Sequence, residues 1–68
     1  MLDRLQITLE AARVNAGYNQ KEASAKLGIS NTTLISWEKG KSMPKANQII
    51  AICDLYGVTY DDLIFLPI

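Results

Sequence analysis

The residues best suited to chemistry lie in one short polar segment, residues 30–36, within the stretch GISNTTLISWEKGK. Asn31, Thr32 and Ser36 carry amide and hydroxyl groups, which both donate and accept hydrogen bonds. Such residues are poor to middling helix formers, so their concentration in a predicted helix is unusual for a merely solvated surface. Short side chains of this kind suit contact with a polar ligand that approaches closely.

Catalytic and metal-binding chemistry finds little support in the sequence. The chain contains one cysteine and no histidine, which argues against a disulfide framework and an ordinary zinc site. No nucleophile accompanies a candidate base, and no glycine-rich loop is suited to cradling phosphate. We therefore expect a protein that is not an enzyme and that binds no cofactor and no metal.

Length and charge predict one cytoplasmic domain over residues 1–68. These 68 residues, 49% of them hydrophobic, suffice for a single small core. Seven basic and seven acidic residues balance overall, but bases concentrate in residues 11–45, whereas residues 46–68 contain acids and no base. No apolar stretch reaches the roughly 18 residues of a membrane span, and the N-terminus lacks a secretion signal.

Helix signals in the first half of the chain predict two helices and the start of a third. The first spans about residues 3–16, where leucines recur at helical spacing before a glycine. The second spans residues 20–27, because a capping-box pattern begins at Asn19. Residues 28–30 leave a short turn in which Ser30 caps the third helix. Such a turn sends the third helix off at a steep angle.

The second half of the chain completes an all-α, compact five-helix prediction. Leu34 and Trp37 give the third helix an apolar edge that anchors it to the core. A basic loop over residues 41–45 precedes a fourth helix that ends at Gly57. Thr59 is suited to capping a short fifth helix. No alternation is strong enough to predict a strand.

The third helix has the surface that nucleic-acid recognition requires. An amide matches the edge of adenine, and methyl groups match the methyl of thymine. The predicted base-reading residues are Asn31, Thr32, Ile35 and Ser36. Phosphate or supporting contacts are predicted for Ser30, Thr33, Lys39, Lys41 and Lys45, because hydroxyls and lysines suit the phosphate backbone. The outward face carries no acid.

These stretches resemble the helix-turn-helix domain of the lambda-repressor and Cro family, also called the XRE family, over residues 9–66. The matching segments are LEAARVNAGYNQKEASAKLGIS, LISWEKGKSMP and IIAICDLYGVTYDDLI. The resemblance implies a lambda-repressor-like DNA-binding fold with its motif at about residues 20–39. It also implies an ion pair between Arg13 and Glu38. Gln20 is implied to meet the DNA backbone and to brace the first residue of the third helix.

The resulting hypothesis is a transcriptional regulator, most often a repressor, that binds a roughly palindromic operator as a homodimer. The third helix would enter the major groove of double-stranded DNA. Apolar residues late in the chain predict the dimer interface, namely Leu55, Ile64, Phe65, Leu66 and Ile68.

Simpler explanations remain open for each of these features. The polar residues also suit an ordinary solvated helix face, and the lysines suit solubilising charges. The C-terminal apolar residues also suit closure of the domain's own core. Zero net charge leaves room for a protein-interaction module of the same fold, such as an antitoxin or adaptor.

Overall fold

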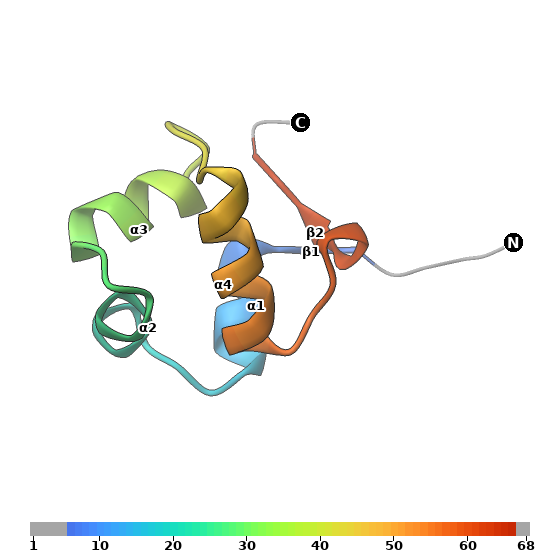
Figure 1. The fold of residues 1–68 in the computed structure, drawn as a ribbon, viewed down its shortest axis with the longest axis horizontal. Helices are drawn as coiled ribbons and strands as arrows, with labels where there is room; N and C mark the ends of the chain where they lie inside the picture. The colour runs from blue at the N-terminus through green and yellow to red at the C-terminus, as the bar shows by residue number, and fades with distance from the viewer. Residues whose placement is uncertain (1–5, 67–68) are drawn as a thin grey trace, which may run out of the picture.

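The computed structural model describes residues 6–66, and four α-helices lie within that range (Figure 1). They are α1 (Leu9–Asn15), α2 (Gln20–Leu27), α3 (Asn31–Glu38) and α4 (Ala46–Tyr56). A 3-10 turn, η1 (Tyr60–Asp62), follows α4. Strands β1 (Ile7–Thr8) and β2 (Leu63–Ile64) pair in parallel, Ile7 with Leu63 and Thr8 with Ile64. In Figure 1, α2 and α3 lie on one side of α4, and the strands lie on the other.

The prediction of a fifth helix was wrong for the described residues. Only the 3-10 turn η1 follows Thr59, and Leu63 is already extended, with φ −96° and ψ 141°. The extended backbone directs the Leu63 side chain into the core, where it is 5% exposed. Ile64 and Phe65 favour the same conformation because β-branched and aromatic residues pack well in strands. Core filling and strand pairing therefore replace the helix.

The first helix begins later than predicted, and the prediction that no strand would form was also wrong. Thr8 ends the extended segment by capping α1, since its hydroxyl accepts a hydrogen bond from the Ala11 backbone N–H at 3.1 Å. Ile7 and Thr8 are β-branched and pair with β2 in place of a helical turn. The part of the predicted helix before residue 6 lies outside the described residues.

The helix-turn-helix connection is as predicted, with α2 over residues 20–27 and a three-residue turn. The capping box is present, because Asn19 Oδ1 accepts from the Glu22 N–H at 2.7 Å and Glu22 Oε1 accepts from the Asn19 N–H at 2.9 Å. Gly28 ends α2 at φ +72°, a left-handed conformation that disfavours other residues. Ser30 Oγ then caps α3 by accepting from the Thr33 N–H at 3.1 Å.

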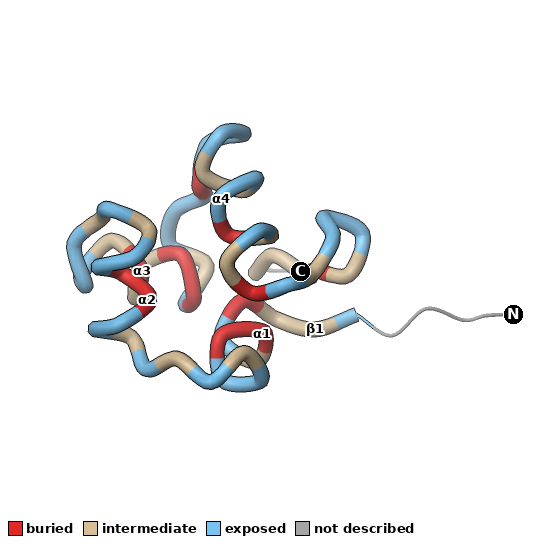
Figure 2. The backbone as a smooth tube through the Cα atoms, turned by 60° about the horizontal axis from the view of Figure 1, so that its bottom comes forward, coloured by how far each residue is buried: buried red, intermediate tan, exposed pale blue. Residues whose placement is uncertain are grey.

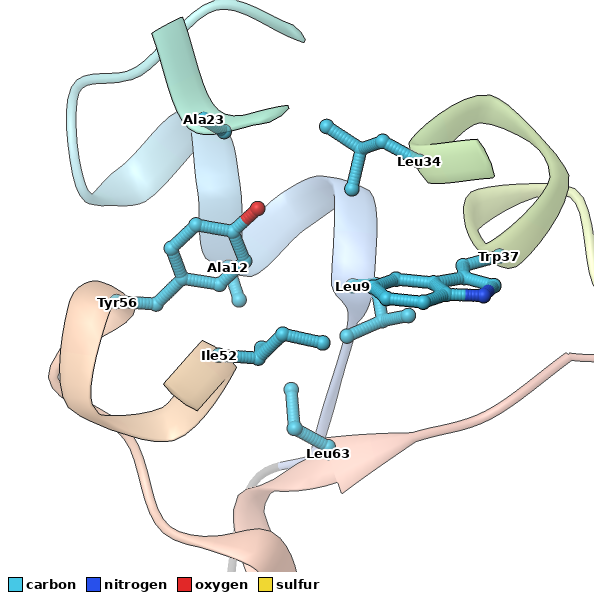
Figure 3. Packing of buried hydrophobic residues seen from close by; sticks show 8 residues of the cluster. All are labelled: Leu9, Ala12, Ala23, Leu34, Trp37, Ile52, Tyr56 and Leu63. Carbon is cyan, nitrogen blue, oxygen red and sulfur yellow. The ribbon is translucent and has the colours of Figure 1, made fainter. Parts of the chain in front are cut away.

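The core lies where the four helices meet, and α3 is anchored in it by two side chains. Leu34 is 1% exposed and Trp37 is 5% exposed. Figure 3 shows both reaching toward residues of α1 and α4. The buried hydrophobic cluster consists of Leu9, Ala12, Ala23, Leu34, Trp37, Ile52, Tyr56 and Leu63. Figure 2 shows that the helices carry exposed residues on their outer sides.

A buried network at Glu38 joins three helices. Arg13 Nε on α1 donates to Glu38 Oε2 at 2.7 Å, and Gln20 Nε2 on α2 donates to Glu38 Oε1 at 3.0 Å. Arg13 Nη1 also donates to the carbonyl oxygen of Tyr18 at 2.9 Å. Arg13 and Glu38 are each 7% exposed. The hydrogen bond to Glu38 raises the pKa of Arg13, which keeps the guanidinium charged despite its burial. We call Arg13, Gln20 and Glu38 the Glu38 network.

The core contains one polar group without a hydrogen bond among the described residues, the hydroxyl of Tyr56. Tyr56 is 7% exposed, and its oxygen points toward the part of the cluster where Ala23 lies (Figure 3). Burial raises the pKa of Tyr56 to about 12, with a further increase from Glu38 and an opposing effect of Arg13. The neutral phenol is therefore the form that the folded state favours.

We expect Glu38→Ala to lower the free energy of unfolding by about 3–5 kcal/mol, because it leaves the Arg13 guanidinium buried without its counter-ion. The double variant Arg13→Met, Glu38→Leu removes both charges and should lose much less stability. Urea unfolding followed by Trp37 fluorescence measures both variants. A double variant as unstable as Glu38→Ala would contradict the explanation.

We expect the unmodified protein, the parent, to lose stability between pH 10 and about 12 as Tyr56 is deprotonated. Tyr56 holds its proton to a higher pH in the folded state than in the unfolded state. This contribution is present below pH 10 and is lost as the pH rises toward 12. At most, it amounts to about 2–3 kcal/mol. Tyr56→Phe should show a shallower pH dependence in urea unfolding. Tyr60→Phe, which alters an exposed tyrosine, is the control and should follow the parent.

Candidate nucleic-acid interface

The outer face of α3 presents polar side chains and no negative charge. Asn31 and Thr32 are exposed at the start of the helix, and Ile35 and Ser36 are half-buried one turn later. The one carboxylate of α3, Glu38, is buried in the Glu38 network. Because that charge is paired inside the fold, an anion that approaches α3 meets no carboxylate of this helix.

Asn31 and Thr32 differ from the neighbouring residues in being free to bind. Neither side chain makes a hydrogen bond within residues 6–66, and both are exposed, so both are available to a ligand. Ser30 and Thr33, in contrast, bond to each other, with 2.9 Å between their hydroxyl oxygens. Ser30 also caps the helix. The local role of this second pair is to fix the start of α3.

Ser36 connects α3 to the loop that follows it, a contact that sequence reasoning missed. Its Oγ lies 2.9 Å from the Oγ of Ser42. The Lys41 backbone N–H donates to the Ser36 carbonyl at 2.9 Å, and Gly40 turns the chain between them at φ +78°. These bonds hold the lysine-bearing loop against the end of α3. A serine pair six residues apart has no periodic signal, which explains why the pattern did not reveal it.

Gln20 lies at the first position of α2 and is half-buried. The resemblance implied a contact with the first residue of the third helix, but its side-chain hydrogen bond goes to Glu38, the last residue of α3. The structure also places Arg13 and Glu38 together, with the geometry of the buried ion pair given above. Gln20 therefore joins a third helix, α2, to the ion pair that the resemblance implied.

The exposed charges around the end of α3 differ in sign from those beside η1. Lys39, Lys41 and Lys45 are exposed around the end of α3 and the loop before α4. Asp54 and Asp61 are exposed on α4 and η1. Figure 1 shows α3 on one side of α4 and η1, the short coil beside β2, on the other. The basic side chains therefore flank the outer face of α3.

The residues predicted for the dimer interface are half-buried where the structure describes them. Leu55 and Phe65 pack against the hydrophobic core cluster. Ile64 lies in β2, and Leu66 follows it. Ile68 lies outside the described residues. Part of this apolar segment therefore closes the domain's own core, as one of the open explanations held.

Residues 6–66 contain neither a candidate metal cluster nor a membrane-spanning helix. No group of three or more histidine, cysteine, aspartate or glutamate residues there is placed to hold a metal ion. No helix in that range is both long and apolar enough to cross a membrane. Burial raises the pKa of the Cys53 thiol, and Asp54 and Asp62 raise it further. The thiol is thereby disfavoured as a thiolate nucleophile.

Comparison with known proteins identifies relatives of this domain. Over 56 residues, the chain is 39% identical to the HTH-type transcriptional regulator ImmR of Bacillus subtilis (strain 168). The aligned region covers 82% of this chain and 44% of ImmR. Over 52 residues, the chain is 31% identical to the cryptic phage CTXphi transcriptional repressor RstR of Vibrio cholerae. The aligned region covers 76% of this chain and 47% of RstR. The chain thus matches less than half the length of each relative. No solved structure gives a significant match.

The family comparison covers most of the fold described above. The helix-turn-helix family profile matches residues 9–63, from the start of α1 to the first residue of β2. This match includes the Glu38 network, the turn between α2 and α3, and the outer face of α3. Together with the two relatives, it confirms the resemblance that the sequence motifs indicated. The chain belongs to the helix-turn-helix family of the XRE type.

Proposed function

We propose that this chain is a sequence-specific DNA-binding transcriptional regulator that inserts α3 into the major groove. The observation that carries the proposal is the outer face of α3, where Asn31 and Thr32 are exposed and unbonded while Glu38 is buried. Base edges are read by short donors and acceptors, and a surface carboxylate would repel the phosphates. Membership of the helix-turn-helix family supports the same function.

The dimensions of α3 suit this role. An α-helix with its side chains is about 10–12 Å across, which fits the roughly 12 Å width of the major groove, and the eight residues of α3 extend about 12 Å along it. In this arrangement, the Asn31 amide pairs with the edge of adenine and the Thr32 methyl group contacts thymine. Ile35 and Ser36 extend the reading surface by one turn.

Contacts with the phosphate backbone fall to the residues around α3. Lys39, Lys41 and Lys45 are exposed and flank the helix, so they can neutralise phosphates on either side of the groove. Ser30, Thr33 and Gln20 serve mainly to position α3, because their hydrogen bonds lie within the fold. This division assigns specificity to α3 and much of the affinity to the lysines.

A homodimer on a roughly palindromic operator completes the proposal. One eight-residue helix reads few base pairs, whereas two copies related by a two-fold axis read two half-sites about one helical turn apart. Repression is the favoured mode because such a complex occupies DNA that other proteins need. Of the two relatives, RstR is a transcriptional repressor and ImmR is a transcriptional regulator.

A protein-interaction module of the same fold is the second candidate. It is favoured by the zero net charge, since a strongly basic chain would bind DNA more readily at physiological salt. Titration of the protein with a random duplex at low salt separates the two functions. Binding that weakens with added salt supports the DNA proposal, and absence of binding at every salt concentration supports the interaction module.

We expect Asn31→Ala to relax the preference for one operator position, because the variant loses the amide that reads the base. The measurement is selection of bound sequences from a random duplex pool, followed by affinity for the preferred site. The free energy of binding to the preferred site should become less favourable by about 1–3 kcal/mol, whereas binding to random DNA should change little. An equal loss on all sequences would show that Asn31 does not read a base.

Lys41→Ala is the matched variant for the phosphate contacts. We expect it to weaken binding to every duplex by a similar factor, because phosphates carry no sequence information. The slope of log K against log salt should become less steep by about one unit. A sequence-dependent loss, or an unchanged slope, would count against the phosphate contact.

A further inference from the structure

An apolar surface of α4 faces η1, and Cys53 within it also packs against the core. The α4 residues of this surface are Ala46, Ile49, Ile50 and Cys53. Together with Asp54 and Tyr60, they line a groove of about 560 Å³. Ile50 is 64% exposed and Tyr60 is 59% exposed. Large exposed apolar side chains gathered in one groove typically mark a binding surface. We call these four residues of α4 the α4 stripe.

The groove lies on the other side of α4 from the DNA-reading elements. It is formed by α4 and η1, and η1 lies across α4 from α2 and α3 in Figure 1. A separate hollow, lined partly by Leu27, Trp37 and Ala51, occupies the side of α4 toward α2 and α3. A partner seated on the α4 stripe would therefore leave α3 uncovered.

The α4 stripe is complementary to an antiparallel copy of itself. Its centre lies between Ile49 and Ile50, and Ala46 and Cys53 are equally far from that centre along the helix. When two α4 helices are related by a two-fold axis at this point, Ile49 of one copy faces Ile50 of the other, and Ala46 faces Cys53. The isoleucines at the centre set the distance between the axes, and the small residues at both ends do not push the helices further apart than the distance of about 8–10 Å that packed helices show.

The charges beside the stripe favour the same arrangement. Lys45 precedes the stripe and Asp54 follows it, again equally far from the centre, and both are exposed. Neither forms an ion pair within residues 6–66. An antiparallel pair places Lys45 of each copy beside Asp54 of the other, whereas a parallel pair places like charges together. The pattern therefore selects both a second copy as the partner and the orientation of its helix.

We propose that the groove between α4 and η1 binds α4 of a second copy of this chain in an antiparallel, two-fold symmetric dimer. The proposal rests on the homodimer of the proposed function and identifies its interface. Leu55 and Phe65 contribute less because they do not line the groove. Ile50 and Tyr60 instead lose most of their exposed apolar surface only when a second copy covers them.

Disulfide cross-linking of Ala46→Cys with the native Cys53 tests the interface. Within one chain these positions are separated by about 10 Å along the helix, which is too far for a disulfide. Across the proposed dimer they face each other. Mild oxidation should convert most of this variant to a reducible covalent dimer on a denaturing gel. Ala51→Cys is the control, because it places an exposed thiol on the other side of α4, and it should stay mainly monomeric.

A third variant reports the orientation. Ala46→Cys combined with Cys53→Ala should lose the cross-link, because the antiparallel arrangement keeps the two introduced cysteines apart. Cross-linking by this double variant would indicate a parallel pair and overturn the proposal. Equal cross-linking by Ala46→Cys and Ala51→Cys would indicate random collisions and would also overturn it.

Charge reversal tests the ion pairs without a change in redox conditions. Sedimentation without DNA should show that Lys45→Glu weakens the dimer at least several-fold, and that adding Asp54→Lys restores it. A dimer that neither cross-links nor responds to these charges would overturn the α4 interface but leave the homodimer of the proposed function intact. A monomer at high micromolar concentration would overturn both, while duplex titration tests DNA binding independently.

Discussion

The position of α3 depends on the carboxylate of Glu38. A helix of eight residues is too short to be stable alone in water, so its form and orientation must come from tertiary contacts. Glu38 supplies them by accepting hydrogen bonds from Arg13 on α1 and Gln20 on α2. Leu34 and Trp37 add apolar burial on the same helix. Three helices thus meet at one buried anion.

The same burial determines what α3 presents to solvent. Glu38 is the helix's only acid, and pairing it with Arg13 removes that charge from the surface. Asn31 and Thr32 are left exposed at the start of α3 and Lys39 at its end, and α3 exposes no carboxylate. One interaction therefore stabilises the fold and also gives its exposed helix the electrostatic character that an anionic ligand requires.

The two exposed surfaces of the domain have different physical characters. The face of α3 is polar and flanked by lysines, whereas the α4 stripe is apolar, with one base and one acid at its ends. The parallel pairing of β1 with β2 joins the segment before α1 to the segment after η1. Leu63 closes the core at that point and is buried, whereas Ile50 is left exposed.

The sequence by itself determined the central part of the fold, because its signals there are local. The capping box at Asn19, the left-handed Gly28 and the cap at Ser30 each act within a few residues, and they correctly placed α2 and the turn before α3. The polar residues of α3 were likewise visible as a pattern. The helical spacing of leucines, however, could not reveal that Thr8 would begin α1, because the competing strand depends on a partner far along the chain.

Only the tertiary structure decided the features that depend on contacts between distant residues. It replaced the expected fifth helix with η1 and β2, because burial of Leu63 and pairing with β1 favour an extended backbone. It brought Gln20 to Glu38 and Ser36 to Ser42, whose separations follow no helical period. It also brought Tyr60 of η1 to the same exposed groove as Ile50 of α4, since residues on different elements come together only when the chain packs.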